Sequence, residues 1–402
     1  MQTADVVIIG AGVNGTSTAL HLARAGVKNI KVVERKHLAA GSSGKSGALV
    51  RTHYTNKPET ELAAYSLNIF HNWAEAIGGD CGFERAGLLV FTPPDKEKEL
   101  RENVAMHQSL GATAQVISAA DALELDPSLY VDDLTYLAYE PDSGYVDANA
   151  TVHSLAAAAQ DAGVEFLFGT EVLSIRSENG CVTGVQTSQG EIATNTAVVI
   201  AGAWANQLFM PLDIKLDVMP RAVRVSVFSW AYGRASTRPS MIDHINNTWS
   251  RPIDSNCTLI GSEWASDTEV LDPNNYSEAV DQDYINLCRD KLVSRVPIME
   301  HSNVRGNWTC ALMQSADARP IIDKLNAVDG LYTMTGDSGT SFKTAPAIGK
   351  ALSEWITDGQ VTSFDMHPFR ASRFAEGKPW VDENDYDGFA ASGVQETRTV
   401  SR

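Results

Sequence analysis

Three glycines near the start of the sequence have the spacing of a backbone loop that holds a phosphate group. Gly10, Gly12 and Gly15 follow an apolar, β-branched run at 5–9 and precede apolar residues at helical spacing over 16–25. Without a Cβ at these positions the chain can turn tightly, a pyrophosphate can approach the backbone, and the helix can pack closely on the strand. N–H groups at the start of the helix also favour negative charge. The spacing therefore predicts a dinucleotide-binding loop.

A second strand and an acidic residue complete this predicted unit. A second strand expected at 30–33 leads into Glu34, so that strand, helix and strand fit within about 30 residues, the size of a βαβ unit. Glu34 is placed to accept hydrogen bonds from an adenosine ribose. We expect the nucleotide to contact the following residues: Gly10, Gly12, Val13, Asn14, Gly15, Glu34 and Arg35. The motif alone does not choose between NAD and FAD.

The position of the later α/β segments favours FAD. Further strands and a helix of this type return at 148–201, and a last strand and helix come at 331–356. Between these two segments, runs within 216–322 in which apolar and polar residues alternate predict an antiparallel sheet. Because the nucleotide domain of many NAD enzymes is compact and uninterrupted, a nicotinamide-linked dehydrogenase is the less favoured alternative.

The predicted fold class is α/β, or α+β overall, with a Rossmann-like, discontinuous FAD-binding domain and a substrate domain built on a mostly antiparallel sheet. The expected segments of the FAD-binding domain are 1–80, 145–215 and 323–380. Those of the substrate-binding domain are 81–144 and 216–322, and residues 381–402 are expected to form a loosely held polar tail.

Composition argues against several classes of partner. The 402 residues carry a formal net charge of −18, which disfavours nucleic acid or an anionic membrane surface. The N-terminus lacks a basic region before its first apolar run, and no apolar stretch approaches the roughly 20 residues of a membrane span, so we expect a cytoplasmic protein. The five cysteines are scattered, so neither a disulfide framework nor a metal site is expected. The oligomeric state stays open.

Five segments together give the chain a family resemblance. They are residues 10–15 with Glu34, then 41–51, 198–204, 317–322 and 336–343. With these motifs the sequence resembles the D-amino-acid-oxidase-type superfamily of FAD-dependent oxidoreductases, and within it the sarcosine oxidase and glycine oxidase group, over roughly residues 4–370. The combination is specific for the superfamily and less so for the substrate.

The resemblance implies further cofactor contacts beyond the glycine loop. Ser42, Ser43 and Gly47 are expected along the cofactor between pyrophosphate and flavin, and Val172 at its adenine end. Gly202 and Trp204 are expected in a turn beside the cofactor. The pyrimidine edge of the flavin is expected to be lined by four residues of one loop: Gly336, Ser338, Gly339 and Thr340. There a helix N-terminus stabilises negative charge on the reduced ring.

The resemblance also implies a substrate with a carboxylate and an amine. Arg51 and Lys343 match positions that hold the substrate carboxylate in sarcosine oxidases, and a planar guanidinium fork with a compact ammonium suits that task. The family reaction passes a hydride from the α-carbon to flavin N5, gives an imine that water hydrolyses, and reoxidises the flavin with O2 to H2O2. The expected substrate is a small amino acid, most of all an N-substituted glycine.

Side chains that shape the pocket and select the neutral amine are expected to be His53, Tyr54, Trp249 and Glu263. Glu263 stands near a position that is histidine in monomeric sarcosine oxidases, so it either pairs with a cationic amine or is an ordinary strand residue. Ala48 stands where those enzymes have a second arginine, which predicts a roomier pocket.

The segment 257–261 lacks the lysine that assists oxygen activation in monomeric sarcosine oxidases. Either another cation such as Arg221 substitutes, or the chain is a dehydrogenase that passes electrons to a carrier. A further alternative is the flavin subunit of a hetero-oligomer.

Cys310 stands where monomeric sarcosine oxidases attach the flavin through a thioether. Two interpretations stay open, covalent attachment or a buried thiol that packs. Attachment requires a lowered thiol pKa, for which Arg319 is the expected neighbouring cation.

Overall fold

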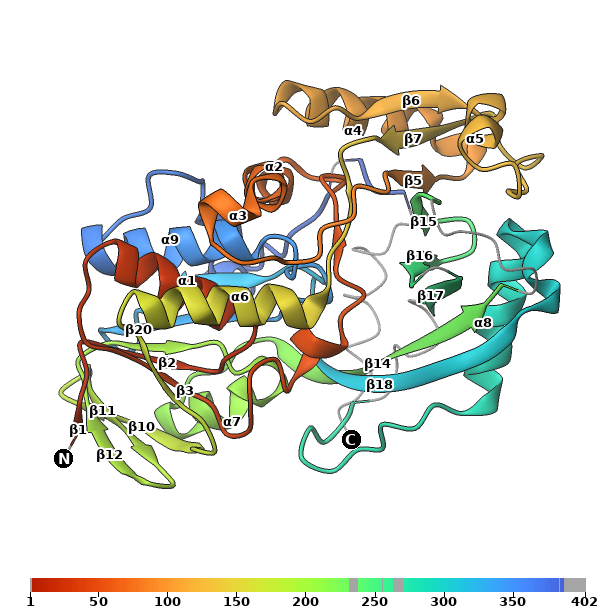
Figure 1. The fold of residues 1–402 in the computed structure, drawn as a ribbon. Coiled ribbons are helices and arrows are strands. Elements are labelled where there is room, and N and C mark those ends of the chain that lie inside the picture. The colour runs from red at the N-terminus through yellow and green to blue at the C-terminus, as the bar shows by residue number, and fades with distance from the viewer. Residues whose placement is uncertain (1, 231–237, 255, 263–269, 383, 387–402) are drawn as a thin grey trace.

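The computed structural model describes residues 2–230, 238–254, 256–262, 270–382 and 384–386. Its main elements are a mostly parallel sheet flanked by helices and a large, mostly antiparallel sheet beside it (Figure 1). The predicted site residue Glu263 lies outside the described residues.

The mostly parallel sheet has six strands in the order β19-β20-β13-β2-β3-β9. Five strands run parallel, and β19 pairs antiparallel with β20 at one edge. The bounds are β2 Val6–Ile9, β3 Ile30–Val33, β9 Glu165–Leu167, β13 Ala197–Val199, β19 Ile321–Lys324 and β20 Leu331–Thr335. Every residue of β2, β3, β13 and β20 is buried, which explains the continuous apolar runs of β2 and β13.

Alternate residues of β2 show how this sheet is covered on both faces. Ile8 packs in a core with α1 (Val13–Arg24), α6 (Ala148–Asp161) and α9 (Ala345–Asp358). Val7 and Ile9 pack on the opposite face, against α7 (Ala205–Phe209) and a four-stranded sheet. The strands of that smaller sheet are β1 Gln2–Thr3, β12 Gly190–Ala193, β11 Cys181–Thr187 and β10 Val172–Glu178. Helices α2 (Lys57–His71) and α3 (Trp73–Ala76) lie beyond α9 and α6 (Figure 1).

The large sheet has eight strands in the order β18-β14-β17-β16-β15-β5-β7-β6. Neighbours pair antiparallel, except β15 with β5. The bounds are β5 Leu88–Phe91, β6 Gln115–Ser118, β7 Tyr136–Glu140, β14 Val218–Ser229, β15 Ser240–Asp243, β16 Thr248–Ile253, β17 Cys257–Ser262 and β18 Asn303–Ser315. The associated helices are α4 Glu97–Ser109, α5 Ala119–Leu125 and α8 Gln282–Arg295.

The short elements complete the described part of the chain. Strands β4 (Leu49–Val50) and β8 (Gly144–Tyr145) pair with each other. Short 3-10 turns lie at Ser42–Lys45, Pro94–Lys96, Gly202–Trp204, Met210–Leu212, Pro297–His301, His367–Phe369 and Ala371–Arg373. No helix within the described ranges is long and apolar enough to cross a membrane.

The predicted fold class is confirmed. A mixed α/β architecture with one mostly parallel and one mostly antiparallel sheet matches the expectation from the sequence. The strands of the large sheet all come from 88–140 and 218–315. The domain limits stay a prediction.

Helix α1 begins at Val13, three residues earlier than the apolar pattern indicated, because Gly12 already acts as its N-cap.

The C-terminal segment departs from the expected loose tail. Asp382 is 6% exposed and forms an ion pair with Arg319, and Tyr386 is 2% exposed in an apolar cluster under β5 and β7. A buried acid with a cationic partner and a buried aromatic ring anchor this stretch. The polar composition of the segment hid these two anchors, and residues 387–402 lie outside the described range.

Candidate functional site

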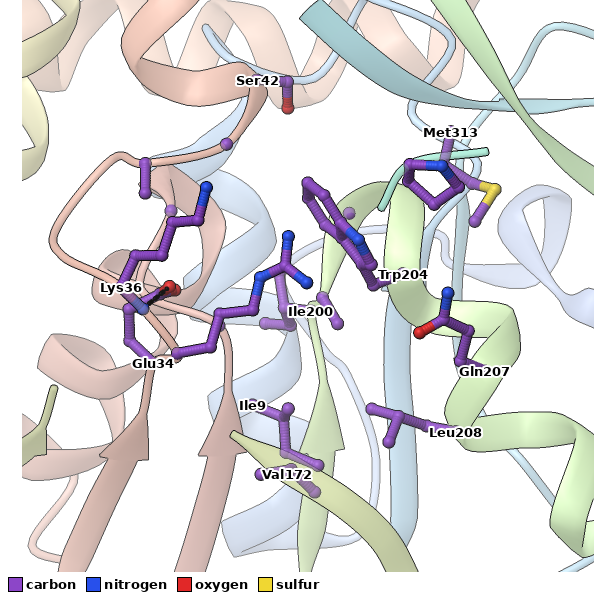
Figure 2. A pocket seen from close by; sticks show the side chains of 18 of the residues that line it. Ile9, Glu34, Lys36, Ser42, Val172, Ile200, Trp204, Gln207, Leu208 and Met313 are labelled. Atoms are coloured by element: carbon purple, nitrogen blue, oxygen red, sulfur yellow. Dashed lines mark hydrogen bonds between the residues drawn. The ribbon is translucent and has the colours of Figure 1, made fainter. Parts of the chain in front are cut away.

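A pocket of about 720 Å³ lies where strands of the six-stranded sheet end. Ile9, Val33 and Thr335 line it as the last residues of β2, β3 and β20. Figure 2 shows Glu34 and Lys36 on one side of the pocket and Trp204, Gln207 and Met313 on the other. Open α/β sheets bind ligands in such a crevice beyond the carboxyl ends of their strands.

The glycine loop at this pocket cannot carry side chains at two of its positions. Gly10 has a φ of +112°, and a Cβ there would lie 2.4 Å from the carbonyl oxygen of Ile200. A Cβ on Gly15 would lie 2.0 Å from the carbonyl oxygen of Gly10, so the first turn of α1 sits directly on the strand end. The loop therefore has the close backbone packing that a dinucleotide-binding turn requires.

The start of α1 faces this pocket with backbone N–H groups. Gly12 is the N-cap and, as a glycine, has no side chain that could accept a hydrogen bond from the first amides of the helix. The Val13 amide donates to Ser43 Oγ at 3.0 Å and the Ala11 amide to Glu34 Oε2 at 3.1 Å. A helix start lined by polar groups is suited to a pyrophosphate. These residues fit the phosphate and ribose of an FAD.

Across the pocket, Arg35 stacks on the indole of Trp204, with its guanidinium carbon 3.9 Å from the ring centroid. Both side chains donate to Asn274 Oδ1, Arg35 at 3.2 Å and Trp204 at 2.8 Å. Asn274 comes from a segment with no motif of its own, so its place at this site could not be predicted from the sequence. The three side chains link the end of β3 to the opposite wall.

The pocket brings together most of the predicted cofactor-binding residues. Those that line it are Gly10, Gly12, Val13, Asn14, Glu34, Arg35, Ser42, Ser43, Val172, Gly202, Trp204 and Gly336. The predicted residues that do not line it are Gly15, Gly47, Cys310, Ser338, Gly339, Thr340 and Lys343.

A second group of predicted residues meets around the ring of Tyr54. The Arg51 guanidinium carbon lies 4.5 Å, and Lys343 Nζ 5.0 Å, from the Tyr54 ring centroid. Tyr54 Oη and Lys343 Nζ both donate to the carbonyl oxygen of Thr340, at 2.7 and 2.8 Å. Burial raises the pKa of Tyr54, so its ring stays neutral between the two cations. We call Arg51, Tyr54, Thr340 and Lys343 the cation cluster.

An ion-pair network that the sequence did not indicate supports the cation cluster. Thr340 Oγ1 donates to Glu59 Oε1 at 3.2 Å, and Glu59 pairs with Arg319 at 3.2 Å. Arg319 also pairs with Asp382. This network ties the loop before α9 to the first turn of α2 and to the C-terminal segment.

His53 and Trp249 are two further predicted pocket residues, and they have other neighbours than the two cations at the Tyr54 ring. His53 is 3% exposed, with Nε2 2.9 Å from Tyr386 Oη. Burial, together with His107 and Arg51, lowers its pKa well below the usual value, so the imidazole is neutral. The Trp249 ring lies against Gly47, where a Cβ would come within 2.3 Å of the indole.

The model of the FAD dependent oxidoreductase family (DAO) matches residues 5–355. This chain belongs to that family. The mouse mitochondrial pyruvate dehydrogenase phosphatase regulatory subunit is 28% identical over 92% of this chain, which spans 43% of that relative. Sarcosine oxidase subunit beta from Rhodobacter capsulatus is 22% identical over 92% of this chain and 90% of its own length. The solved L-proline dehydrogenase from P. horikoshii superposes with a TM-score of 0.86, 21% identity, and coverage of 94% of this chain and 100% of that one.

The predicted resemblance to the sarcosine and glycine oxidase group is confirmed, and so is FAD as cofactor. The chain spans less than half the length of the mouse relative, and that protein has further sequence with no counterpart in the match.

Cys310 is a buried thiol on β18 whose surroundings differ from the expectation. Burial raises its pKa to about 12, and the cation acting on it is Lys45. Arg319 was the wrong neighbour, because its guanidinium is held by Glu59 and Asp382. Lys45 is itself paired with Glu278.

The segment 257–261, which lacks the lysine that assists oxygen activation in monomeric sarcosine oxidases, lies in the buried strand β17 (Cys257–Ser262). The proposed substitute, Arg221, stands opposite Leu312 on β18, two positions from the Val223 that faces Cys310. Arg221 and Cys310 therefore share one face of the β14–β18 pair. Arg221 Nε is buried, and no hydrogen-bond partner for it lies in the part of the chain that the structure describes.

The segment 317–322, one of the marks of the resemblance, has a structural role at its first residue. Asp317 accepts two hydrogen bonds from Arg373, at 2.7 and 2.9 Å, and both side chains are almost fully buried. Breaking such a buried pair would leave an uncompensated charge.

Proposed function

We propose that this protein oxidises the carbon–nitrogen bond of a small amino acid, with an N-substituted glycine as the expected substrate. The observation that carries the proposal is the cation cluster. Arg51 and Lys343 come from distant parts of the sequence, yet both lie within 5.0 Å of the centroid of one tyrosine ring. A guanidinium fork and an ammonium group together suit a substrate carboxylate.

FAD supplies a two-electron acceptor that takes a hydride equivalent from the substrate α-carbon. Arg51 and Lys343 hold the carboxylate and so fix the position of that carbon. The nitrogen lone pair forms the C=N bond as the hydride leaves, and water then splits the imine into a carbonyl compound and an amine. No strong base is required, which agrees with a neutral His53 and a neutral Tyr54.

The pocket residues would hold the cofactor through backbone and side-chain contacts. The loop at Gly10–Gly15 and the start of α1 suit the pyrophosphate, and Glu34 suits the ribose. The proposed contacts of Ser338, Gly339 and Thr340 with the flavin rest on the family resemblance.

Two electron acceptors are compatible with this site. We propose O2 as acceptor, giving H2O2, with Arg221 as the cation near the cofactor. A dehydrogenase passing electrons to a carrier is the alternative, favoured by the absence of lysine from 257–261. Steady-state peroxide formation in air, compared with reduction of an artificial acceptor dye, separates the two.

Anaerobic bleaching of the flavin absorption tests the substrate class. A panel should contain N-alkyl glycines, cyclic secondary amino acids, primary amino acids and the methyl esters of each. We expect N-alkyl glycines to bleach the flavin fastest and the esters to react far more slowly, because the esters lack the carboxylate. Equal bleaching by acids and esters, or none by any acid, would overturn the proposal.

A second candidate is a flavin subunit that works only within a hetero-oligomer. Two of the relatives are named as subunits, sarcosine oxidase subunit beta and a phosphatase regulatory subunit. Gel filtration and the same bleaching assay on the chain expressed alone distinguish the candidates, since a dependent subunit would bind FAD without being reduced by the panel.

A further inference from the structure

Three buried side chains from separate parts of the chain meet beside the segment that carries Arg51 and Tyr54. They are His53, His107 on α4, and Glu140 at the end of β7. Their exposed fractions are 3%, 0% and 2%. One ligand atom from each lies within 4.8 Å of the other two. Buried polar groups normally have hydrogen-bond partners, so such a cluster requires an explanation.

His107 has its proton on the nitrogen that faces away from the other two side chains. Its Nε2 lies 2.8 Å from the carbonyl oxygen of Tyr54. Because a carbonyl oxygen accepts, Nε2 must carry the hydrogen, and Nδ1 then presents a bare lone pair. Nδ1 is buried and has no hydrogen-bond partner among the described residues. Burial lowers the pKa of His107, which keeps this lone pair free of a proton.

His53 is placed in a similar way, with the difference that its partner is a hydroxyl, which can accept from or donate to Nε2. Its Nε2 lies 2.9 Å from Tyr386 Oη, and its buried Nδ1 has no hydrogen-bond partner in the described part of the chain. Nδ1 is 3.8 Å from Glu140 Oε1, beyond hydrogen-bonding distance. The two imidazole rings lie 4.6 Å apart, centroid to centroid, at 68°. Two buried ring nitrogens without a hydrogen-bond partner are energetically unfavourable.

The third group, Glu140, is held in place by three hydrogen bonds to its carboxylate oxygens. Oε1 accepts from Thr52 Oγ1 at 2.7 Å, and Oε2 accepts from the Thr52 amide at 3.0 Å and from Ser143 Oγ at 2.5 Å. Metal-binding histidines usually donate their second ring N–H to a carboxylate, a backbone carbonyl or a water, and metal-binding carboxylates are themselves hydrogen-bonded. All three side chains here have hydrogen-bond partners on their outer sides.

We propose that His53 Nδ1, His107 Nδ1 and Glu140 Oε1 bind a divalent cation of the zinc class. Two imidazoles and one carboxylate form a ligand set that Zn²⁺ accepts with a fourth position open, whereas Ca²⁺ and Mg²⁺ prefer oxygen ligands. Bonds of about 2.0–2.2 Å would draw the ligand atoms together from their present spacing. Arg51 opposes a bound cation electrostatically, and the Glu140 charge offsets part of that repulsion.

Such an ion would act on the architecture of the site. It would join α4 and β7 to the segment after β4, which carries Arg51 and Tyr54. His107 already bonds the Tyr54 backbone, so the ion would fix the backbone on which the cation cluster stands. This role is independent of the amine chemistry proposed above.

Metal analysis of the flavin-loaded protein tests the proposal. The protein is incubated with Zn²⁺, gel-filtered to remove free metal and analysed by mass spectrometry. We expect about one Zn²⁺ per chain, as for a single site of this kind. His107→Gln and Glu140→Gln should each lower the bound zinc at least tenfold. The matched control is His153→Gln, on the exposed side of α6, which should bind zinc like wild type.

Co²⁺ provides a second readout that does not depend on the variants folding. Wild-type protein loaded with Co²⁺ should show visible d–d absorption, measured against the flavin-containing blank, and Zn²⁺ but not Mg²⁺ should raise its Tm. Wild-type protein with less than a tenth of an equivalent of zinc and no Co²⁺ absorption would overturn the proposal. So would zinc contents that are equal in His107→Gln, His153→Gln and wild type.

Discussion

The nucleotide pocket and the cation cluster are built in different ways. One wall of the pocket is made of short stretches of neighbouring residues, at 9–10, 12–14, 33–36 and 40–43, and its glycine loop contributes backbone groups. The cation cluster is made of side chains from 51–54 and 340–343, and its support comes from Glu59, Arg319 and Asp382. A backbone site depends on where a side chain is missing, whereas a side-chain site depends on where the fold brings distant residues together.

This difference predicts how the two regions respond to substitution. A side chain added to the glycine loop would occupy the space of the pyrophosphate, so the loss of FAD binding should be nearly complete. Removing one cation from a shared site leaves the other in place, so the activity should fall only in part.

Replacing Gly12 by valine should abolish FAD binding, the largest effect expected. A Cβ on Gly12 would lie 2.9 Å from Ser43 Oγ, and the β-branched side chain would occupy the space that the pyrophosphate needs. The measurement is flavin content per chain after purification, with circular dichroism to show that the fold remains.

The matched control for that loop is Gly306→Val. A Cβ on Gly306, in β18, meets nothing within 4 Å in the described part of the chain, so this variant should purify yellow. A fully yellow Gly12→Val protein would contradict the loop assignment and remove the contrast between the two regions.

Replacing Arg51 by alanine should lower kcat/KM by roughly 30–1,000-fold, which corresponds to about 2–4 kcal/mol, while FAD content stays unchanged. The physical reason is the loss of a charge-assisted contact to the substrate carboxylate. Kinetics are measured on whichever substrate bleaches the flavin fastest. Arg85→Ala serves as control, because Arg85 is an exposed arginine paired with Asp142. Unchanged kinetics in Arg51→Ala would take Arg51 out of the site.

The parts of this molecule that could be predicted from sequence are those determined by short-range pattern. The buried runs of β2, β3 and β20 and the loop between Gly10 and Gly15 were clear from residue type and spacing. Arg51 and Lys343 were found through family motifs, and spacing alone would not have paired them. The structure does not describe Glu263, so its role stays a prediction.

His107 and Glu140 had no signal in the sequence, and Arg319 was expected beside Cys310 instead of in an ion-pair network with Glu59 and Asp382. Each comes singly from a helix, a strand or a loop, without a neighbouring ligand at a telling spacing. Their partners are set by how the large sheet packs on the segment after β4. Asp382 and Tyr386 were missed for a related reason, since a polar, acidic composition outweighed two residues that the fold buries.

Asp337 provides a smaller test, at the border between the two regions. Burial raises the pKa of the Asp337 carboxyl from 3.8 to about 6. A hydrogen bond from the Gly339 amide and the charge of Lys343 act in the opposite direction and lower it, but burial has the larger effect. The folded state thus binds the proton more tightly than the unfolded state. The stability that this group contributes is fully present below pH of about 4 and is lost as pH rises through about 6.

Asp337→Asn should therefore become more stable than wild type, by about 1–2 kcal/mol, as pH rises from 4.5 to 7.5 in urea unfolding of the flavin-free protein. Asn retains an acceptor for the Gly339 amide, so the comparison isolates the charge. A pH-independent difference between the two proteins would show that Asp337 ionises like an exposed acid.

The smallest effect expected is that of Cys310→Ala on flavin retention. Attachment through a thioether requires the thiolate, and burial raises the thiol pKa to about 12, which leaves roughly one thiol in ten thousand or fewer ionised near neutral pH. Lys45 acts on this thiol, but its charge is shared with Glu278, and Arg319 is held elsewhere. We therefore expect acid precipitation to leave the flavin in the supernatant for wild type and variant alike. A yellow wild-type pellet that turns colourless in Cys310→Ala would instead show that the bound cofactor activates this thiol, and Cys310 would then become a covalent link between β18 and the cofactor.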